Sequence, residues 1–250
     1  MRKTICIDCG HGGSDCGAVA IDKSLEKDFT LSLGSALRDH LIEHYDCAVI
    51  MTRETDIDVD LGERAMIANR AKAALLISLH HDNSGNPLAR GGSMYIHTNK
   101  RNEQDPTKLA WLPAVSGDGT VNHEAPNSYR MASVMVPTIR AELDRYGIPW
   151  RSMGDPAGIM CADFWVLDQS WGACALLECY FGSNADDNWA AKRPAFVPDL
   201  AKDTAQAIAE ALQLPKRSST TPAVPAGCIL VKGKPVQCGA RIVDGKSIGE

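Results

Sequence analysis

The segment Thr4-Ile5-Cys6-Ile7-Asp8-Cys9-Gly10-His11-Gly12-Gly13 decides how this chain folds. Its first half is a short apolar run typical of a buried strand, and its second half is a glycine-rich turn that carries a histidine. In sheets covered by helices, ligands bind at the carboxyl ends of the strands, so His11 stands where an active site is expected. A phosphate-cradling loop is the alternative, but no Gly-Lys-Ser/Thr follows and the dinucleotide glycine spacing is absent.

Further apolar runs alternate with helical patterns along the chain. We expect short, mostly buried strands at residues 4–8, 48–52, 74–79, 93–97 and 173–179. Amphipathic patterns predict helices at residues 29–44, 61–73, 128–146 and 198–212. Strands that alternate with helices predict an α/β layered domain.

Changes in composition predict how the chain is divided. We expect the main domain at residues 1–214, a Pro/Ser/Thr-rich linker at 215–227 and a short tail at 228–250 that is too small to hold a core of its own. Inside the main domain, residues 99–127 lack regular patterning and are rich in Gly, Pro, Asp, Asn and Thr. This stretch is either a functional loop or a disordered one.

The bulk composition excludes several classes of protein. The chain has 250 residues, a net charge of −5 and a pI near 5.8, so it lacks the basic surplus that nucleic-acid binding needs. No apolar run is long enough to cross a bilayer, so no transmembrane segment is expected. The nine cysteines are scattered without the spacing of a disulfide framework and are expected to be mostly reduced and packed as small hydrophobes.

Three more candidate site residues lie at the ends of apolar elements. His80 ends the third apolar run, Glu178 ends the last one, and Glu26 precedes the first long helix. Because side chains alternate along a strand, only one of His80 and His81 is expected to face the site. Glu26 alone would be an ordinary first-turn acid, whereas a carboxylate that ends an apolar strand is costly to bury without a task. Together the residues match a zinc site with three protein ligands, an open position and a general base.

Ordered motifs along the chain strengthen this interpretation. They are Asp8-Cys9-Gly10-His11-Gly12-Gly13-Ser14-Asp15-Cys16-Gly17-Ala18, Glu26-Lys27, Thr52-Arg53, Leu61-Gly62-Glu63-Arg64 with Ala68-Asn69, Ser78-Leu79-His80 and Leu177-Glu178-Cys179-Tyr180-Phe181-Gly182-Ser183-Asn184. In this order, over about residues 3–212, the chain resembles the zinc-dependent N-acetylmuramoyl-L-alanine amidases of the Amidase_3 type. Cys9 replaces the usual proline, and Cys179-Tyr180 replaces the commoner small residue and glycine, but neither change removes a candidate ligand or base.

The resemblance implies a fold, a cofactor and a reaction. The implied fold is a single three-layer α/β domain with a twisted, mostly parallel sheet flanked by helices, followed here by the short tail. The residues that match the family's zinc ligands are His11, Glu26 and His80, and Glu178 matches its catalytic glutamate. The implied reaction is hydrolysis of the amide bond between N-acetylmuramic acid and L-alanine in peptidoglycan, with Glu178 moving the proton from the attacking water to the leaving amine.

Two other classes of function remain as alternatives. A cysteine-dependent amidase or peptidase would use Cys179 or Cys16 beside a histidine, but it would leave Glu26 and Glu178 without roles. A non-catalytic wall-binding module would have lost a ligand or the base, and all four candidate residues are present.

The remaining polar residues of the motifs are assigned supporting roles. We favour Arg53 and Arg64 as braces for neighbouring acids, such as Glu54, Asp56 and Glu63, over contacts with substrate carboxylates. Asp82 or Asn83 is expected to orient the His80 ring. We expect His81, His97 and His123 to be polar neighbours rather than ligands.

The N-terminal sequence and the tail bear on where the protein acts. The first residues are patterned as a core strand and not as a secretion signal, so we expect synthesis in the cytoplasm followed by action on the cell wall. This is typical of a phage or prophage endolysin released through a membrane pore, while a host enzyme exported differently is the alternative. The tail segment Val231-Lys232-Gly233-Lys234-Pro235-Val236 faintly resembles the start of a wall-associated repeat.

Overall fold

The computed structural model describes residues 2–97, 114–115, 121–122, 125–152, 155–217, 228–231, 234–237, 241–243 and 246–248. The strands are β1 (Lys3–Cys9), β2 (Cys47–Met51), β3 (Leu75–Asp82), β4 (Ser93–His97), β5 (Ala114–Val115), β6 (Val121–Asn122), β7 (Ile159–Ala162), β8 (Cys174–Phe181), β9 (Cys228–Val231), β10 (Lys234–Gln237), β11 (Arg241–Val243) and β12 (Lys246–Ile248). The helices are α1 (Glu26–His44), α2 (Leu61–Arg70), α4 (Ala125–Arg145), α5 (Trp165–Asp168), α6 (Ala185–Ala191) and α7 (Phe196–Leu212).

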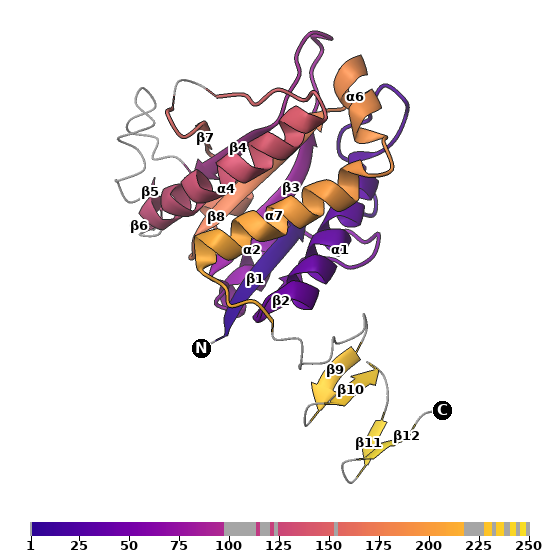
Figure 1. The fold of residues 1–250 in the computed structure, drawn as a ribbon, viewed down its shortest axis with the longest axis vertical. Coiled ribbons are helices and arrows are strands. Elements are labelled where there is room, and N and C mark those ends of the chain that lie inside the picture. The colour runs from indigo at the N-terminus through magenta and orange to yellow at the C-terminus, as the bar shows by residue number, and fades with distance from the viewer. Residues whose placement is uncertain are drawn as a thin grey trace.

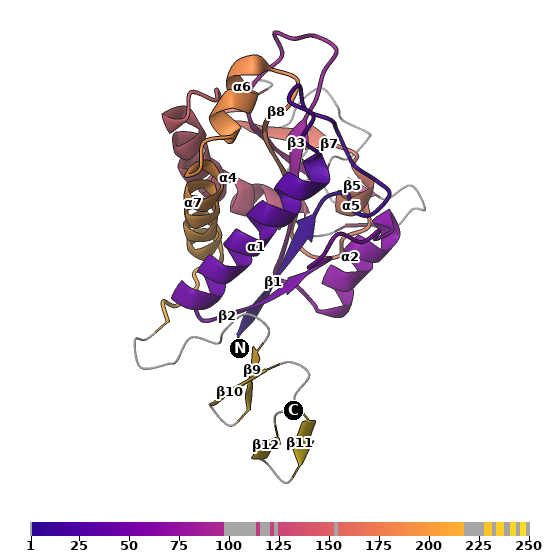
Figure 2. The same ribbon diagram turned by 90° about the vertical axis from the view of Figure 1, so that its right-hand side faces the viewer.

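A six-stranded sheet forms the middle layer of the domain (Figure 1). Its strand order is β2-β1-β3-β8-β4-β7, in which β2, β1, β3 and β8 run parallel and β4 runs antiparallel to β8. Helices α1, α4 and α7 pack together on one face, and α2 and α5 cover part of the other (Figure 2). The predicted three-layer α/β domain with a mostly parallel sheet is therefore confirmed.

All the expected strands and helices are present, together with short elements that were not predicted. The five expected strands and four expected helices correspond to β1, β2, β3, β4, β8 and to α1, α2, α4, α7. The sequence reading missed β7, α5 and α6, which have only 4, 4 and 7 residues and so carry too few periods to show a pattern. Most of the 99–127 stretch lies outside the described residues, as do most of the linker and parts of the tail.

The end of the main domain is held slightly beyond the expected boundary. After α7 the backbone nitrogen of Asp46 donates to the carbonyl of Pro215, and the nitrogen of Arg217 donates to the carbonyl of His44. The chain therefore stays hydrogen-bonded to the end of α1 through Arg217.

The two faces of the sheet differ in polarity, and this difference positions the site. Side chains alternate along each strand, so Ile5 and Ile7 enter the large core under α1, α4 and α7, whereas Cys6 enters a smaller cluster under α2 and α5. The smaller cluster also contains Leu76 and Leu176. Further along the same face of their strands come four polar residues, and these are Asp8, Ser78, His80 and Glu178.

Cys6 and Cys9 have the Cys-x-x-Cys spacing that can mark a redox pair, and the alternation of side chains places them on opposite faces of the sheet. Cys6 and Cys9 belong to opposite cores, so they do not form a redox pair. Seven cysteines with described side chains are free thiols and five of them are buried, as the sequence predicts; these are Cys6, Cys9, Cys16, Cys47, Cys161, Cys174 and Cys179.

Candidate metal and active site

The turn after β1 carries His11 in an uncommon backbone conformation. His11 has a φ of 61°, in the left-handed region that residues with side chains rarely adopt. The Arg64 guanidinium stabilises this turn, because it donates to the carbonyl oxygens of Cys9 (2.7 Å) and His11 (2.8 Å). It also pairs with the buried carboxylate of Asp8 at 2.8 Å.

Arg53 supports the same turn from the other side. Its buried guanidinium donates to the carbonyl oxygens of Cys9, Gly10 and Lys27, and to the hydroxyl of Thr30. Both arginine side chains therefore brace the turn after β1.

The acids named as partners of these arginines were wrong. Glu54 pairs with Arg38, Asp56 with Lys27, and Glu63 with Arg70. Arg53 and Arg64 instead donate hydrogen bonds to backbone carbonyl oxygens, and Arg64 also pairs with the Asp8 carboxylate. No local sequence pattern predicts these contacts.

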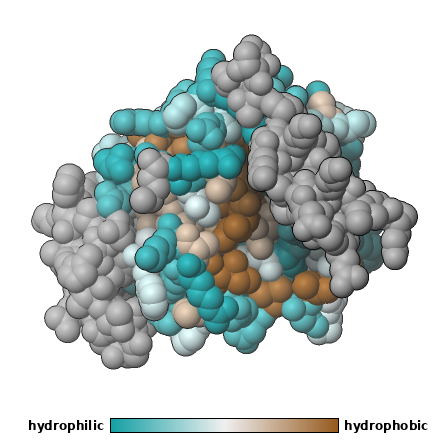
Figure 3. Space-filling view, turned by 90° about the horizontal axis from the view of Figure 1, so that it is seen from below, coloured by the Kyte–Doolittle hydropathy of each residue, from teal (hydrophilic) through white to brown (hydrophobic). Residues whose placement is uncertain are grey.

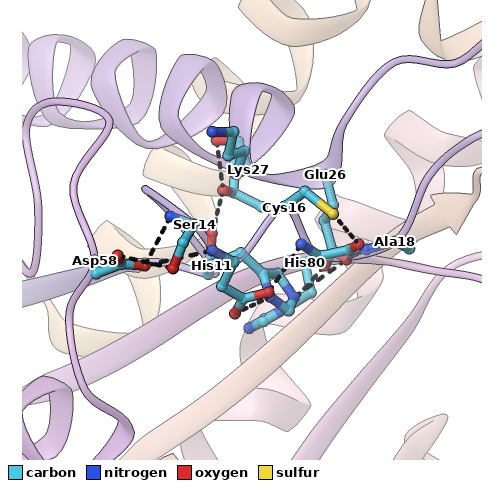
Figure 4. Close-up of polar contacts among 12 residues, drawn as sticks. His11, Ser14, Cys16, Ala18, Glu26, Lys27, Asp58 and His80 are labelled. Atoms are coloured by element: carbon cyan, nitrogen blue, oxygen red, sulfur yellow. Dashed lines mark hydrogen bonds and ion pairs between the residues drawn. The ribbon is translucent and has the colours of Figure 1, made fainter.

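Three donor groups converge at the carboxyl edge of the sheet (Figure 4). Glu26 lies between two imidazoles, with its Oε2 at 3.2 Å from His11 Nε2 and its Oε1 at 2.9 Å from His80 Nδ1. The two rings meet edge to face, with centroids 5.0 Å apart. The structure therefore brings together the three residues that the sequence singles out as ligands.

Glu26 is held as part of this site and not as an ordinary first-turn acid. Its side chain is only 4% exposed, and its two oxygens accept hydrogen bonds from the backbone nitrogens of His81 (3.1 Å) and Ala18 (2.8 Å). These bonds hold the carboxylate beside the two histidines.

Two glycines allow this close approach. A Cβ at Gly10 would lie 2.3 Å from the His80 ring, and a Cβ at Gly17 would lie 2.6 Å from the His11 ring and 2.7 Å from a Glu26 oxygen. Gly17 also has a φ of 65°, so a side chain there would be disfavoured twice.

The pKa values of the cluster reflect strong mutual electrostatics. Burial opposes protonation of His11, but the hydrogen bond and charge of Glu26 outweigh it and raise the pKa of His11 to about 9. Burial also opposes ionisation of Glu26, yet the two imidazoles hold its pKa below the ordinary value. The site thus stabilises positive charge next to the carboxylate.

Residues outside the predicted set orient the two rings. Asp15 Oδ2 lies 2.8 Å from His11 Nδ1. Ser78 Oγ lies 3.2 Å from His80 Nε2 and donates to Asp8 Oδ2 at 2.6 Å. The two expected partners of His80 were wrong, since Asp82 pairs with Arg151 and the side-chain amide of Asn83 donates to the carbonyl oxygen of Val19. The sequence did contain a signal for Ser78. It stands two residues before His80, so the alternation of side chains along a strand places both on the same face.

Glu178 stands next to His80 on the neighbouring strand. The two residues are paired in the register of β3 and β8, and Ser93 of β4 pairs with Glu178 on its other side. Burial raises the pKa of Glu178 to about 8, with the charges of Glu26 and Asp82 adding to the effect and His80 opposing it. Within the described residues, its buried Oε2 has no hydrogen-bond partner.

The neighbouring residues proposed for other roles face elsewhere. His81 is buried on the opposite side of the strand, against Phe29 and Tyr180, and burial lowers its pKa, so only His80 faces the site as predicted. Cys179 is fully buried in the large core, and burial raises its thiol pKa well above the ordinary value. Such a thiol is a poor nucleophile. Cys16 is half-buried, and its sulfur lies 3.2 Å from the carbonyl oxygen of Gly17.

A second group of possible metal donors lies away from this site. His97, Asp163 and Asp168 place their donor atoms within 4.8 Å of one another, and His97 Nε2 is 3.6 Å from Asp168. Because β4 runs antiparallel to β8, His97 at the end of β4 lies far along the sheet from Glu178. Each of the three side chains has further interaction partners, so we assign no ion to this group. His123 lies outside the described residues.

The opposite end of the domain has an apolar band and a pocket. Seen from below, a band of hydrophobic surface lies between hydrophilic residues (Figure 3). A pocket of about 330 Å³ at the amino ends of β3 and β8 is lined by residues that include Ala68, Leu76, Trp171 and Ala173. It contains none of the candidate catalytic residues.

No helix of the residues described here is long and apolar enough to span a membrane.

Known proteins are similar to this chain in sequence and in fold. A family profile described as N-acetylmuramoyl-L-alanine amidase matches residues 5–210. The chain is 31% identical over 218 residues to an endolysin of Bacillus phage SPP1, a match that covers 87% of this chain and 69% of the endolysin. It is 39% identical over 99 residues to the probable amidase AmiB of Haemophilus influenzae, which covers 39% of this chain and 23% of AmiB.

A solved structure agrees with these matches. The catalytic domain of CwlV, an N-acetylmuramoyl-L-alanine amidase from Bacillus (Paenibacillus) polymyxa var. colistinus, superimposes with a TM-score of 0.68 at 25% identity. The superposition covers 85% of this chain and 99% of that domain. The family profile, the similarity over most of the phage endolysin and the shared fold together show that this chain belongs to the N-acetylmuramoyl-L-alanine amidase family.

Proposed function

We propose that this chain cleaves the amide bond between N-acetylmuramic acid and L-alanine of peptidoglycan as a zinc enzyme. In this proposal His11, Glu26 and His80 hold the ion, and Glu178 is the catalytic base. The family assignment carries the amidase reaction, and the convergence of the three donor groups carries the zinc dependence.

The donor set fits a bound metal ion. Ring nitrogens face carboxylate oxygens at 2.9 and 3.2 Å on both sides of Glu26. A nitrogen lone pair and a carboxylate repel each other at such distances, so either protons or a cation must lie between them. Two imidazoles and one carboxylate are a ligand set that catalytic zinc sites use, and they leave a position open for a water or substrate.

Glu178 would handle the protons of the reaction. When bound, zinc supplies a Lewis acid for the amide carbonyl and for the attacking water. Glu178 accepts a proton as the water oxygen forms its bond to the carbonyl carbon, and it then donates that proton to the alanine nitrogen as the C–N bond breaks. A carboxyl group whose pKa lies near neutrality suits both steps, because it neither holds nor releases the proton too strongly. The buried Oε2 without a partner among the described residues supports this role.

The similarity to a phage endolysin supports action on the cell wall. We propose residues 1–214 as the catalytic domain, joined by the linker at 215–227 to the tail at 228–250. The match of the family profile over residues 5–210 supports the first boundary, and the hydrogen bonds of Pro215 and Arg217 attach the start of the linker to the end of α1.

Release of new amino-terminal alanine from purified peptidoglycan tests the proposal. The protein is assayed as isolated, after chelation, and after chelation followed by added zinc. We expect activity in the first sample, loss in the second and recovery in the third. Glu178→Gln should lose most activity, whereas Glu43→Gln, which changes a side chain that is 66% exposed on α1, should not.

Two outcomes would contradict the mechanism. If the chelated protein cleaved at the normal rate, the zinc assignment would be wrong. If Glu178→Gln cleaved as fast as Glu43→Gln, another base would be acting, and Cys16→Ser and Cys179→Ser would then test the thiol alternative.

A further inference from the structure

We propose that Asp8 and Ser78 form a relay that fixes the proton on Nε2 of His80 and so leaves Nδ1 as the nitrogen that binds the metal. The relay joins three strand residues on one face of the sheet, and it rests on the proposed zinc site. Asp8 and Ser78 are positioning residues, because they act through His80 and do not touch the substrate.

The relay begins at an acceptor that cannot donate. Asp8 is 1% exposed, and its Oδ1 accepts hydrogen bonds from Arg64 Nη1 (2.8 Å) and Thr52 Oγ1 (2.7 Å). Burial opposes ionisation, but the charge of Arg64 and the bonds from Ser78 and Thr52 hold the pKa of Asp8 below its usual value. Asp8 is therefore a carboxylate, which only accepts hydrogen bonds.

Counting protons then determines the roles of the next two groups. Ser78 Oγ lies 2.6 Å from Asp8 Oδ2. Since the carboxylate has no proton, the hydroxyl must donate its single proton to the carboxylate. The remaining lone pairs of Ser78 Oγ face His80 Nε2 at 3.2 Å. A hydrogen bond forms there only if Nε2 carries a proton, which leaves the lone pair of the neutral ring on Nδ1.

That lone pair points to the proposed metal position. His80 Nδ1 lies 2.9 Å from Glu26 Oε1, within the three-residue donor cluster. His11 has the opposite arrangement, because Asp15 accepts from its Nδ1 and leaves Nε2 facing Glu26. The two ligands would thus bind through different nitrogens, and each is oriented by a hydrogen bond on the other one.

The cost of breaking the relay should be measurable as metal affinity. Partners that orient ligating histidines typically contribute about 10- to 100-fold in affinity. Ser78 is fully buried, so no water replaces the lost hydroxyl without entering the core. We expect Ser78→Ala to bind zinc about 10- to 100-fold more weakly than the wild type.

Thr52→Val provides a matched control. Like Ser78→Ala, it removes a hydroxyl that donates to the Asp8 carboxylate. The Thr52 hydroxyl, however, donates to Oδ1 and has no part in the relay. Zinc dissociation constants are measured for the full chain by competition with a chromophoric chelator, and circular dichroism shows that each variant is folded. We expect Thr52→Val to bind zinc nearly as tightly as the wild type.

A second measurement locates the proton in the zinc-loaded wild type itself. Long-range ¹H–¹⁵N correlation spectra of the zinc-loaded wild type show which imidazole nitrogen carries a proton, and His80→Asn identifies the His80 signals. We expect a protonated Nε2 and a metal-bound Nδ1 for His80.

The outcomes separate this inference from the proposed function. A metal-bound Nε2, or a zinc affinity of Ser78→Ala equal to that of Thr52→Val, would overturn the relay while leaving the zinc site in place. A wild type that binds no zinc would refute the proposed function, and the relay would fall with it.

Discussion

Replacing Arg64 by methionine should destabilise the domain far more than an ordinary loss of an ion pair. The Arg64 guanidinium pairs with Asp8 at 2.8 Å, and the two side chains are only 4% and 1% exposed. It also donates to the carbonyl oxygens of Val59, Cys9 and His11. Methionine retains much of the apolar stem but none of these four contacts.

The magnitude follows from what the change leaves behind. Asp8 would remain buried without its cation, and removing one partner of a buried pair typically costs about 3–5 kcal/mol. Since neither side chain reaches solvent, no screening reduces this value. We therefore expect the free energy of unfolding at pH 7 to fall by about 3–5 kcal/mol.

Arg70→Met is the matched control, because it removes the same side chain from the same helix. Arg70 pairs with Glu63 at 2.6 Å, but the two side chains are 62% and 45% exposed. Such pairs contribute less than about 1 kcal/mol. Urea unfolding of both variants, followed by circular dichroism, measures the two losses, and equal losses would refute the reasoning.

The difference between the two variants should also depend on pH. The pKa of Asp8 lies below its ordinary value of 3.8 in the folded protein, so ionised Asp8 stabilises the fold above that value. This contribution is lost as pH falls through the folded-state pKa. Because protonated Asp8 no longer needs a cation, the penalty of Arg64→Met should shrink in acid. A penalty that stayed constant down to strongly acid pH would show that Asp8 is not its source.

Three further predictions concern the site. Glu178→Gln should lower turnover by about 10²- to 10⁴-fold with little change in zinc affinity, so a combined loss of activity and zinc would contradict its role as base. Gly17→Ala should abolish zinc binding because its Cβ would clash with the His11 ring. Gly85→Ala, where nothing lies within 4 Å of the added Cβ, should bind zinc normally. Equal zinc affinities of the two variants would show that the close packing at Gly17 is unimportant. Cys179→Ser should retain amidase activity, and its loss in a folded variant would revive the thiol mechanism.

Local pattern was sufficient to predict most of the architecture and the candidate ligands. Apolar runs of five or more residues showed the main strands, and the carboxyl ends of those runs pointed to His11, His80 and Glu178. This worked because parallel strands end at the same edge of a sheet, so residues far apart in sequence are brought to one place. Glu26 was singled out only together with the other three residues, since a first-turn acid by itself has an ordinary explanation.

Tertiary contacts decided the parts that no local pattern encodes. Asp8 contacts Thr52, Arg64 and Ser78, which lie 44, 56 and 70 residues away in sequence. Which cation pairs with which acid depends on the positions of whole elements, so the nearby acids assigned to the arginines were wrong. The direction of β4 and the short elements β7, α5 and α6 likewise depend on packing against the finished sheet. Periodicity records only which face of an element is buried, whereas side-chain partners and proton positions are set where separate elements meet.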